Sequence, residues 1–235
     1  MSISENVAIV KDRIERAARA AGRRPDEITL VAATKTNSAE AVAEAIRAGV
    51  SICGENRAQE LLEKNALGAY NGAKLHFIGH LQKNKVRQLV GVCDLIQSVD
   101  SAELLEAINS RAEALGIVQS VLIEINIGSE ASKSGIDKSE LSYILAKAEN
   151  LPSVFVKGLM TIPPISGSEA ENRSCFARMR QLFVDNSSKK YDNISMDFLS
   201  MGMSGDFEDA IAEGSNMVRV GSAIFGVRVY PPKTC

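Results

Sequence analysis

The stretch LVAATKTNSAEAV (residues 30–42) passes from an apolar run through a polar turn into a helical pattern. The apolar run is typical of a buried strand, and the residues after Ser38 have the period of an amphipathic helix. Lys35 stands where the strand ends. A lysine at that place is either an ordinary solvated residue or an amine that takes part in chemistry, and its position alone leaves both readings open.

The same unit, a short apolar run followed by a helical pattern, recurs along the chain. We predict eight strands, at residues 29–34, 51–53, 75–78, 95–99, 120–127, 154–160, 194–200 and 217–220. Helical patterns follow at 39–48, 56–66, 83–90, 101–115, 138–149, 169–186 and 206–213, with a last turn after Gly221. Eight strands that each precede a helix are the count of a TIM barrel. We therefore expect an α/β protein with a (β/α)8 TIM barrel.

An extra amphipathic helix precedes this pattern. Apolar residues recur at spacings of three and four between Ile3 and Ala21, which is the period of one helix face. Ser2 and Glu5 have the spacing of a capping box, and Gly22 stands where a helix should end. The same box is expected where an aspartate precedes a glutamate by three residues, at Asp100 with Glu103 and at Asp137 with Glu140.

The main alternative to a barrel is an open, doubly wound sheet. Such folds often carry a GxGxxG fingerprint after the first strand, and no such fingerprint follows residue 34. No linker is recognisable, since the Gly- and Pro-containing stretch 161–168 has the position of a strand-to-helix loop. We therefore expect residues 1–235 to form a single domain.

The composition is that of an ordinary globular protein. Hydrophobic residues make up 45% and charged residues 24%, and the net charge is −2, with 27 Lys+Arg against 29 Asp+Glu. No basic excess points to nucleic acid or to a membrane surface. No signal peptide is recognisable, and no apolar run reaches the roughly 18 residues of a membrane span. We expect a soluble cytoplasmic protein, in agreement with four widely spaced cysteines that form no metal or redox motif: Cys53, Cys93, Cys175 and Cys235.

The loops after strands 7 and 8 have the residues of a phosphate site. In TIM barrels chemistry collects at the C-terminal ends of the strands, and phosphate is often held by these two loops. Ser204 follows strand 7, and Gly221 and Ser222 follow strand 8. Glycine lets the backbone approach a ligand, and serine hydroxyls donate hydrogen bonds. Each loop alone could be an ordinary turn, but together at strands 7 and 8 they favour phosphate binding.

A phosphate site changes the interpretation of Lys35. A lysine with a lowered pKa can condense with an aldehyde, and a ligand with both an aldehyde and a phosphate would use both features. Pyridoxal 5′-phosphate (PLP) is such a ligand; a phosphorylated sugar aldehyde is an alternative. Arg219, at the end of strand 8, could hydrogen-bond the pyridine nitrogen and weaken the ring as an electron sink. The alternative for Arg219 is a salt bridge across the barrel mouth.

The two histidines do not indicate a metal site. His76 and His80 are four residues apart, which in an extended strand is roughly 13 Å. We interpret His76 as a strand residue, whereas His80 is either a loop residue or a neighbour of the ligand. The basic cluster Lys83, Lys85 and Arg87 reads as a solvated helix face, with a weak anion-attracting patch as the alternative.

Seven sequence blocks resemble a known family over almost the whole chain. In chain order they are VAATKT, GENRAQEL, LHFIGHLQKNKVR, ASKSGI, GLMTIPP, FLSMGMSGDFEDAI and VRVGSAIFG, between Val31 and Gly226. The chain resembles the YggS/PROSC family of pyridoxal-phosphate homeostasis proteins. The resemblance implies a barrel similar to the N-terminal domain of alanine racemase.

The resemblance also implies a cofactor site. PLP would form a Schiff base with Lys35, the phosphate would be held by Ser204, Gly221 and Ser222, and Arg219 would lie near the pyridine nitrogen. Asn56, after strand 2, and Met201, after strand 7, complete the predicted cofactor-binding set. Relatives often have serine where Thr34 precedes the lysine here, and the hydroxyl is kept. Lys133 could make a secondary PLP contact, with a solvated loop lysine as the alternative.

Two classes of function follow, a carrier that buffers or delivers PLP and a PLP-dependent amino-acid racemase. A two-base racemase needs an acid/base group on each face of the cofactor. None of Tyr70, Tyr143, Tyr191 and Tyr230 follows a strand at the barrel mouth, and only residues 228–235 follow the barrel. We therefore expect the carrier, without catalytic residues, and we expect transient contact with PLP-requiring apo-enzymes. The expected state is a monomer, with a dimer through the outer helices as the alternative.

Overall fold

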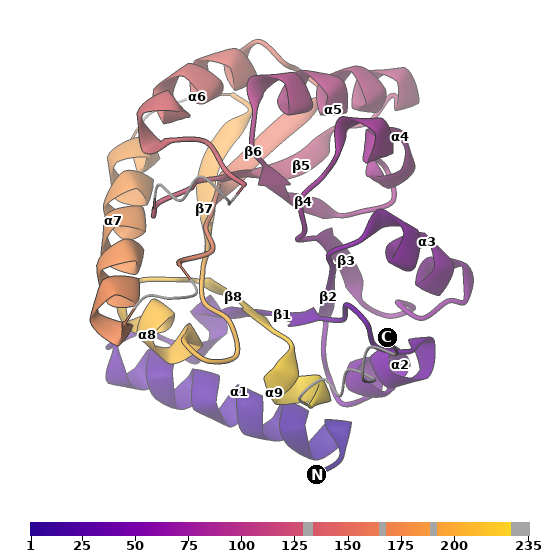
Figure 1. Ribbon diagram of the computed structural model, residues 1–235, viewed down its shortest axis with the longest axis vertical. Coiled ribbons are helices and arrows are strands. Elements are labelled where there is room, and N and C mark those ends of the chain that lie inside the picture. The colour runs from indigo at the N-terminus through magenta and orange to yellow at the C-terminus, as the bar shows by residue number, and fades with distance from the viewer. Residues whose placement is uncertain (129–133, 165–167, 189–191, 227–235) are drawn as a thin grey trace, which may run out of the picture.

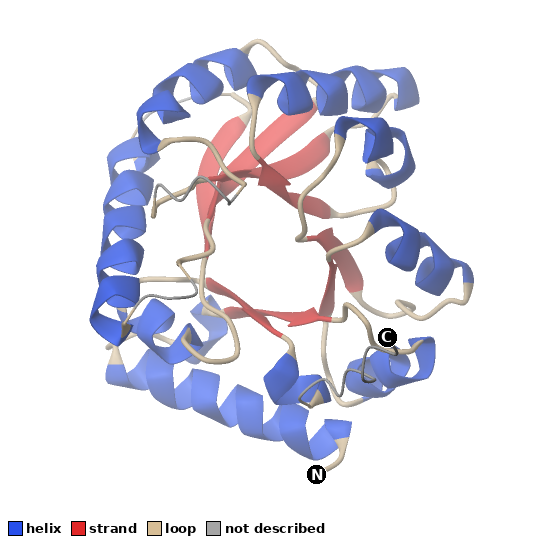
Figure 2. Cartoon of the chain, viewed as in Figure 1, coloured by secondary structure: helices blue, strands red, loops and turns tan. Residues whose placement is uncertain are grey.

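The protein is a closed barrel of eight parallel strands inside a ring of helices (Figures 1 and 2). The structure is a computed structural model and describes residues 1–128, 134–164, 168–188 and 192–226. The strands pair in chain order from β1 to β8, and β8 pairs with β1 to close the barrel. The predicted (β/α)8 TIM barrel is thereby confirmed.

Strands and helices alternate regularly after the first helix. The strands are β1 (Thr29–Ala33), β2 (Ile52–Glu55), β3 (Lys74–Phe77), β4 (Leu95–Val99), β5 (Gln119–Glu124), β6 (Val154–Met160), β7 (Ile194–Ser200) and β8 (Met217–Val220). The α-helices are α1 (Ile3–Ala20), α2 (Ala39–Arg47), α3 (Ala58–Ala66), α4 (Val86–Leu89), α5 (Ala102–Leu115), α6 (Leu141–Glu149), α7 (Glu169–Ser187), α8 (Phe207–Ala212) and α9 (Ser222–Phe225). Short 3-10 helices are η1 (Pro25–Glu27), η2 (Lys83–Lys85) and η3 (Lys138–Glu140).

The predicted N-terminal helix is confirmed as α1. Its capping box is formed as expected, because Ser2 Oγ accepts the N–H of Glu5 and the Glu5 carboxylate accepts the N–H of Ser2. The helix buries one face and lies outside the barrel against α8 and α9 (Figure 1). It thus covers the side of the barrel on which the first and last strands meet.

One predicted helix cap was wrong, and one predicted helix is shorter and less regular than expected. The N-cap of α5 is Ser101, whose Oγ accepts the N–H of Leu104, because the Asp100 carboxylate is instead 2.9 Å from His80 Nδ1. The helix expected at 83–90 is a 3-10 turn followed by the four-residue α4. The predicted box of Asp137 and Glu140 is present, at the start of η3.

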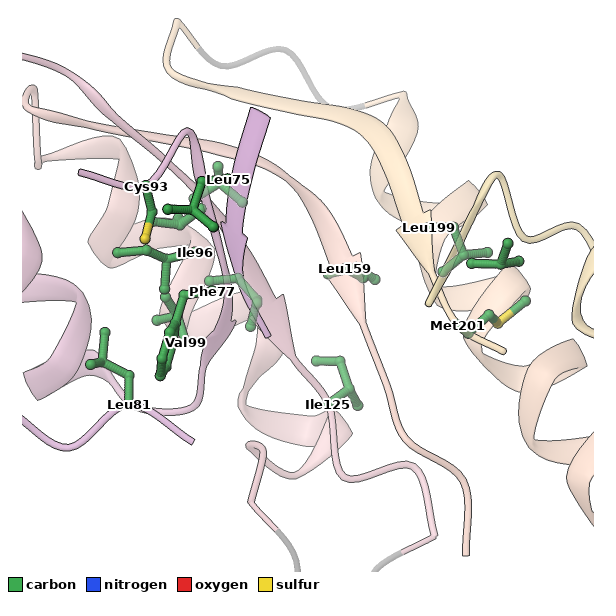
Figure 3. Packing of buried hydrophobic residues seen from close by; sticks show 14 of the residues in the cluster. Leu75, Phe77, Leu81, Cys93, Ile96, Val99, Ile125, Leu159, Leu199 and Met201 are labelled. Carbon is green, nitrogen blue, oxygen red and sulfur yellow. The ribbon is translucent and has the colours of Figure 1, made fainter. Parts of the chain in front are cut away.

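The apolar core has two parts. One part fills the barrel interior, with buried side chains from five strands: Val31, Leu95, Leu122, Met160 and Met217. The larger part lies between the strands and the surrounding helices (Figure 3). Side chains of a strand point alternately to the two sides of the sheet, so each strand contributes to both parts. This is why the predicted strands read as nearly continuous apolar runs.

Gly158 permits a close backbone approach between β6 and β7. Its φ is +137°, and a Cβ there would lie 2.0 Å from the carbonyl oxygen of Phe198 in the neighbouring strand β7. The register between β6 and β7 shifts at this point. Gly116, after α5, also has a positive φ of +66°, but a Cβ there would meet nothing within 4 Å.

These two glycines give a matched test of the fold. Gly158→Ala should lower the free energy of unfolding by about 3 kcal/mol, because the strained backbone and the collision with Phe198 both oppose the new methyl group. Gly116→Ala should cost only about 1 kcal/mol, since the backbone conformation alone opposes it. Urea denaturation followed by circular dichroism measures both. If both variants lost the same free energy of unfolding, the strands β6 and β7 could move apart around the new methyl group without an energetic cost.

Candidate ligand site at the barrel mouth

A cavity of about 510 Å³ lies at the C-terminal ends of β1 and β8. It is lined by five of the seven predicted cofactor-binding residues: Lys35, Ser204, Arg219, Gly221 and Ser222. Lys35 comes from the loop after β1. The others come from the loop after β7, from β8, and from the turn after β8 that leads into α9. The cavity therefore brings together the amine and the loops that the sequence singled out separately.

The other two predicted residues do not line this cavity. Asn56 lines a neighbouring cavity of about 300 Å³ between the loops after β2 and β3, together with His80. Met201 has 0% exposed surface and belongs to the core outside the barrel. Met203, two residues further on, lines the cavity instead. Sequence reasoning missed further lining residues next to the predicted ones, namely Thr36, Asn37 and Phe225.

Ser204 joins the loops after β7 and β8. Its Oγ accepts the backbone N–H groups of Gly221 and Ala223, at 3.1 and 3.2 Å. The hydroxyl hydrogen of Ser204 is therefore left to donate to a ligand. Gly221 also lies close to β1, since a Cβ there would be 3.3 Å from the Cβ of Ala33. The two loops thus form one polar wall of the cavity.

Arg219 supplies a buried cation at the base of the cavity. Its two terminal nitrogens donate to Ser200 Oγ at 2.6 Å and to the carbonyl oxygen of Thr161 at 2.8 Å. Only 4% of the residue is exposed, and this burial lowers the pKa of Arg219 to about 10. The guanidinium therefore remains charged at neutral pH. Within the described residues Arg219 makes no ion pair, which disfavours the predicted alternative of a salt bridge across the mouth.

A chain of buried polar side chains supports Arg219 from inside the barrel. Ser200 Oγ donates to Gln97 Oε1 at 2.7 Å, and Gln97 Nε2 lies 3.0 Å from His76 Nδ1. Burial lowers the pKa of His76 to about 4, so its ring is neutral and Nδ1 accepts the hydrogen bond. His76 lies in β3, as predicted. Its partner Gln97 comes from β4, and the next member of the chain, Ser200, comes from β7, which sequence spacing could not reveal.

Glu124 is a buried acid at the end of β5. It is 5% exposed, and its pKa is raised to about 7, mainly by burial and further by the nearby Asp100, against the opposing effects of Arg219 and His80. At neutral pH this carboxyl group is therefore divided between its protonated and ionised forms. A buried carboxyl with such a pKa makes the folded protein sensitive to pH.

The remaining candidates lie away from the cavity. His80 is near Asp100 and Ser134, with its Nδ1 at 2.9 and 3.1 Å from their oxygens. Lys83 and Arg87 are exposed, as expected for a solvated helix face, whereas Lys85 is half-buried and lines the neighbouring cavity with Asn56 and His80. The predicted secondary contact, Lys133, lies outside the described residues.

The described ranges contain neither a metal cluster nor a membrane helix. No three of their His, Cys, Asp and Glu side chains are grouped so as to hold a metal ion. None of their helices is both long and apolar enough to cross a membrane. Cys53, Cys93 and Cys175 are buried thiols outside any disulfide, and burial raises the pKa of Cys53 and Cys93 to about 12. These two thiols are therefore protonated at neutral pH.

The raised pKa of Glu124 predicts a pH-dependent stability. An unfolded glutamate titrates near 4.3, whereas Glu124 titrates at about 7 in the folded protein. The folded state holds the proton more tightly, so the resulting stability is complete below about pH 4.3 and is lost as the pH rises through about 7.

Glu124→Gln should therefore gain stability over the wild type as the pH rises. The difference in free energy of unfolding should grow by on the order of 3 kcal/mol between about pH 4 and about pH 8. Urea denaturation at each pH measures it, with Glu113→Gln at an exposed position on α5 as the control. A constant difference would contradict the raised pKa.

Comparison with known proteins identifies relatives along the whole chain. The profile of the alanine racemase N-terminal domain matches residues 6–229. The pyridoxal phosphate homeostasis protein of Aquifex aeolicus is 41% identical, over 98% of this chain and 100% of the relative. The protein of the same name from Escherichia coli is 43% identical, over 98% of this chain and 99% of the relative.

Solved structures also resemble the fold of this chain. An unknown protein from Bifidobacterium adolescentis superposes with a TM-score of 0.85 at 40% identity and covers 94% of both chains. PipY of Synechococcus elongatus, with PLP bound, has a TM-score of 0.79 at 34% identity, over 91% of this chain and 100% of PipY. Alanine racemase of Corynebacterium glutamicum shares the fold, with a TM-score of 0.69 at 17% identity over 61% of its own length. The chain belongs to the family of pyridoxal phosphate homeostasis proteins, whose barrel is that of the alanine racemase N-terminal domain.

Proposed function

We propose that this protein binds PLP as a Schiff base on Lys35 and buffers or delivers it, and so maintains vitamin B6 and amino- and keto-acid homeostasis. The observation that carries the proposal is that Lys35 and the polar wall of Ser204, Gly221 and Ser222 line one cavity. The PLP bound to the related PipY supports the same ligand. When bound, PLP supplies an aldehyde for the amine and a phosphate for the polar wall.

The polar wall fits a phosphate group. It offers two serine hydroxyls, and no carboxylate is among the described lining residues of the cavity to repel an anion. Glycine at 221 lets a phosphate oxygen approach the main chain without meeting a side chain. Ser204 Oγ already accepts two backbone N–H groups, so its own hydroxyl hydrogen points away from them.

Arg219 fits the ring nitrogen of PLP. A charged guanidinium donates hydrogen bonds and accepts none, so a pyridine nitrogen in contact with it stays unprotonated. The unprotonated ring withdraws electrons weakly and therefore favours little carbanion chemistry. The hydrogen bonds to Ser200 and Thr161 keep the guanidinium in place. This arrangement suits storage of the cofactor better than turnover of amino acids.

The carrier is favoured over the racemase because neither of the two described tyrosines lines the cavity that contains Lys35. Tyr70 is buried and donates to Glu55, and Tyr143 is 56% exposed on α6. The other two tyrosines, at positions 191 and 230, lie outside the described residues. The names of the relatives denote homeostasis rather than an enzyme activity. We therefore propose that the protein has no robust catalytic activity of its own.

The proposal extends to the organisation of the molecule. Residues 1–235 act as one PLP-binding domain, since the family profile and the closed barrel both span most of the chain. The protein works in the cytoplasm as a monomer. It exchanges PLP with solvent or with apo-enzymes through transient contacts at the barrel mouth, where the cavity opens.

Mixing with PLP tests the role of Lys35. The protein should turn yellow and show a Schiff-base absorbance that borohydride removes, with the reduced adduct on Lys35 by mass spectrometry. Lys35→Ala should lose the band, whereas Lys11→Ala, at an exposed lysine of α1, should keep it. A wild-type protein that stays colourless after incubation with PLP would refute the cofactor assignment.

Ser204→Ala tests the phosphate contact separately. Loss of one hydrogen bond to a charged group should weaken PLP binding by about tenfold or more. Affinity for pyridoxal, which has the aldehyde but no phosphate, should be nearly unchanged. Ser174→Ala, at an exposed position on α7, is the control for both ligands. If the affinities for PLP and for pyridoxal fell equally, Ser204 would not contact the phosphate.

Two assays separate the carrier from the racemase. Transfer of PLP to an apo-enzyme in the presence of a trap for free PLP shows whether delivery is direct, because only direct handover survives the trap. Exchange of the α-proton of an amino acid reports racemase chemistry. Stereospecific exchange at a useful rate, abolished by Lys35→Ala, would favour the racemase over the carrier.

A further inference from the structure

A cluster of buried charged residues contacts the segment that carries Lys35. Lys64 of α3 is 6% exposed and Glu55 of β2 is 0% exposed. Lys64 Nζ lies 2.7 Å from Glu55 Oε1 and 2.7 Å from Glu60 Oε1. The Tyr70 hydroxyl also donates a hydrogen bond to Glu55 Oε1, at 3.1 Å. The cofactor contacts proposed above use none of these groups.

Lys64 holds the backbone on the N-terminal side of Lys35. Its third hydrogen bond is to the carbonyl oxygen of Thr34, at 2.8 Å. The Thr34 hydroxyl in turn donates to Glu55 Oε1 at 2.7 Å. An ammonium group has three donors, and Lys64 uses all three on Thr34, Glu55 and Glu60. The peptide that enters Lys35 is thereby tied to α3.

Glu60 holds the backbone on the other side of Lys35. Its Oε1 accepts the backbone N–H of Thr36. Thr36 has a φ of +65° and is the one non-glycine residue with positive φ in the described ranges. This conformation costs a β-branched residue about 1–3 kcal/mol and persists only where surrounding contacts enforce it. The carboxylate of Glu60 is such a contact.

Stability alone does not explain a buried charge cluster at this place. Burying an ion pair removes two charges from water, and apolar replacements of similar volume are often as stable. Lys64 and Glu60 belong to one turn of α3, four residues apart, and they bind the main chain immediately before and after Lys35. The feature that this pairing specifies is the direction in which the Lys35 side chain leaves the backbone.

We propose that Glu60 and Lys64 are positioning residues that orient the Lys35 amine towards the aldehyde of a ligand seated on the polar wall. This inference rests on the proposed function. In the step that they assist, the nitrogen of Lys35 bonds to the aldehyde carbon and the carbonyl oxygen leaves as water with the two amine hydrogens. Orientation of the reacting groups before the reaction raises the rate of such a condensation. Lys64 itself does not react, because all of its donors are engaged and it is buried.

The rate of Schiff-base formation after rapid mixing with PLP tests the inference. Glu60→Ala removes the acceptor of the Thr36 N–H and should slow the reaction by about tenfold or more. Glu60→Gln keeps an oxygen at that place and should restore a large part of the rate. Glu63→Ala is the matched control on the same helix, because the Glu63 carboxylate is an acceptor for Gln59. Its rate should equal that of the wild type.

Binding of 4-deoxypyridoxine 5′-phosphate, which has the phosphate but no aldehyde, separates positioning from structural damage. Its affinity should change by less than about twofold in Glu60→Ala, since the phosphate contacts are untouched. A parallel loss of this affinity would show that the cluster supports the whole cavity, and an unchanged rate in Glu60→Ala would overturn the inference directly. A wild-type protein that binds the analogue but forms no Schiff base would instead refute the proposed function and the inference with it.

Discussion

Pairing of β1 with β8 is the constraint on which the site depends. Thr29–Ala32 align with Met217–Val220, so the first and last strands of the barrel lie side by side (Figure 1). Because all the strands are parallel, their C-terminal ends share one rim. The close approach of Gly221 to Ala33 marks the point of contact. The segments that follow these strands therefore bring Lys35 to the same cavity as Gly221, although the two are remote in sequence.

The barrel interior combines an apolar layer with a polar one. Apolar side chains fill one part of it, while hydrogen bonds connect Arg219, Ser200, Gln97 and His76 in the other. Buried polar groups are costly unless they are paired, and such a network then fixes the orientation of its members. Burial disfavours the charged form of each titratable group, so it lowers the pKa of a base and raises the pKa of an acid. It keeps His76 neutral, leaves Arg219 charged and brings the pKa of Glu124 close to neutrality.

Position along a strand was sufficient to predict which residues reach the barrel mouth. Ser204, Gly221 and Ser222 follow predicted strands, and the fold then places them at the mouth. The prediction was incomplete where the direction of a side chain mattered. Met201 lies just beyond β7 and is fully buried, whereas Met203 reaches the cavity. The regular alternation of strand side chains ends with the strand, so sequence spacing no longer indicates which residue faces the ligand.

The sequence by itself determined the order of the elements, because apolar runs and helical periodicity are local properties of the chain. It also determined which residue types stand at the strand ends, and Lys35 among them. Only the tertiary structure decided which of these residues share a cavity and what holds them there. Lys64 and Glu60 lie within the helical pattern at 56–66, yet Lys64 is buried and both residues bind the backbone next to Lys35. Contacts between α3 and the loop after β1 form only when β1 and β2 lie side by side in the barrel, so no local sequence pattern predicts them.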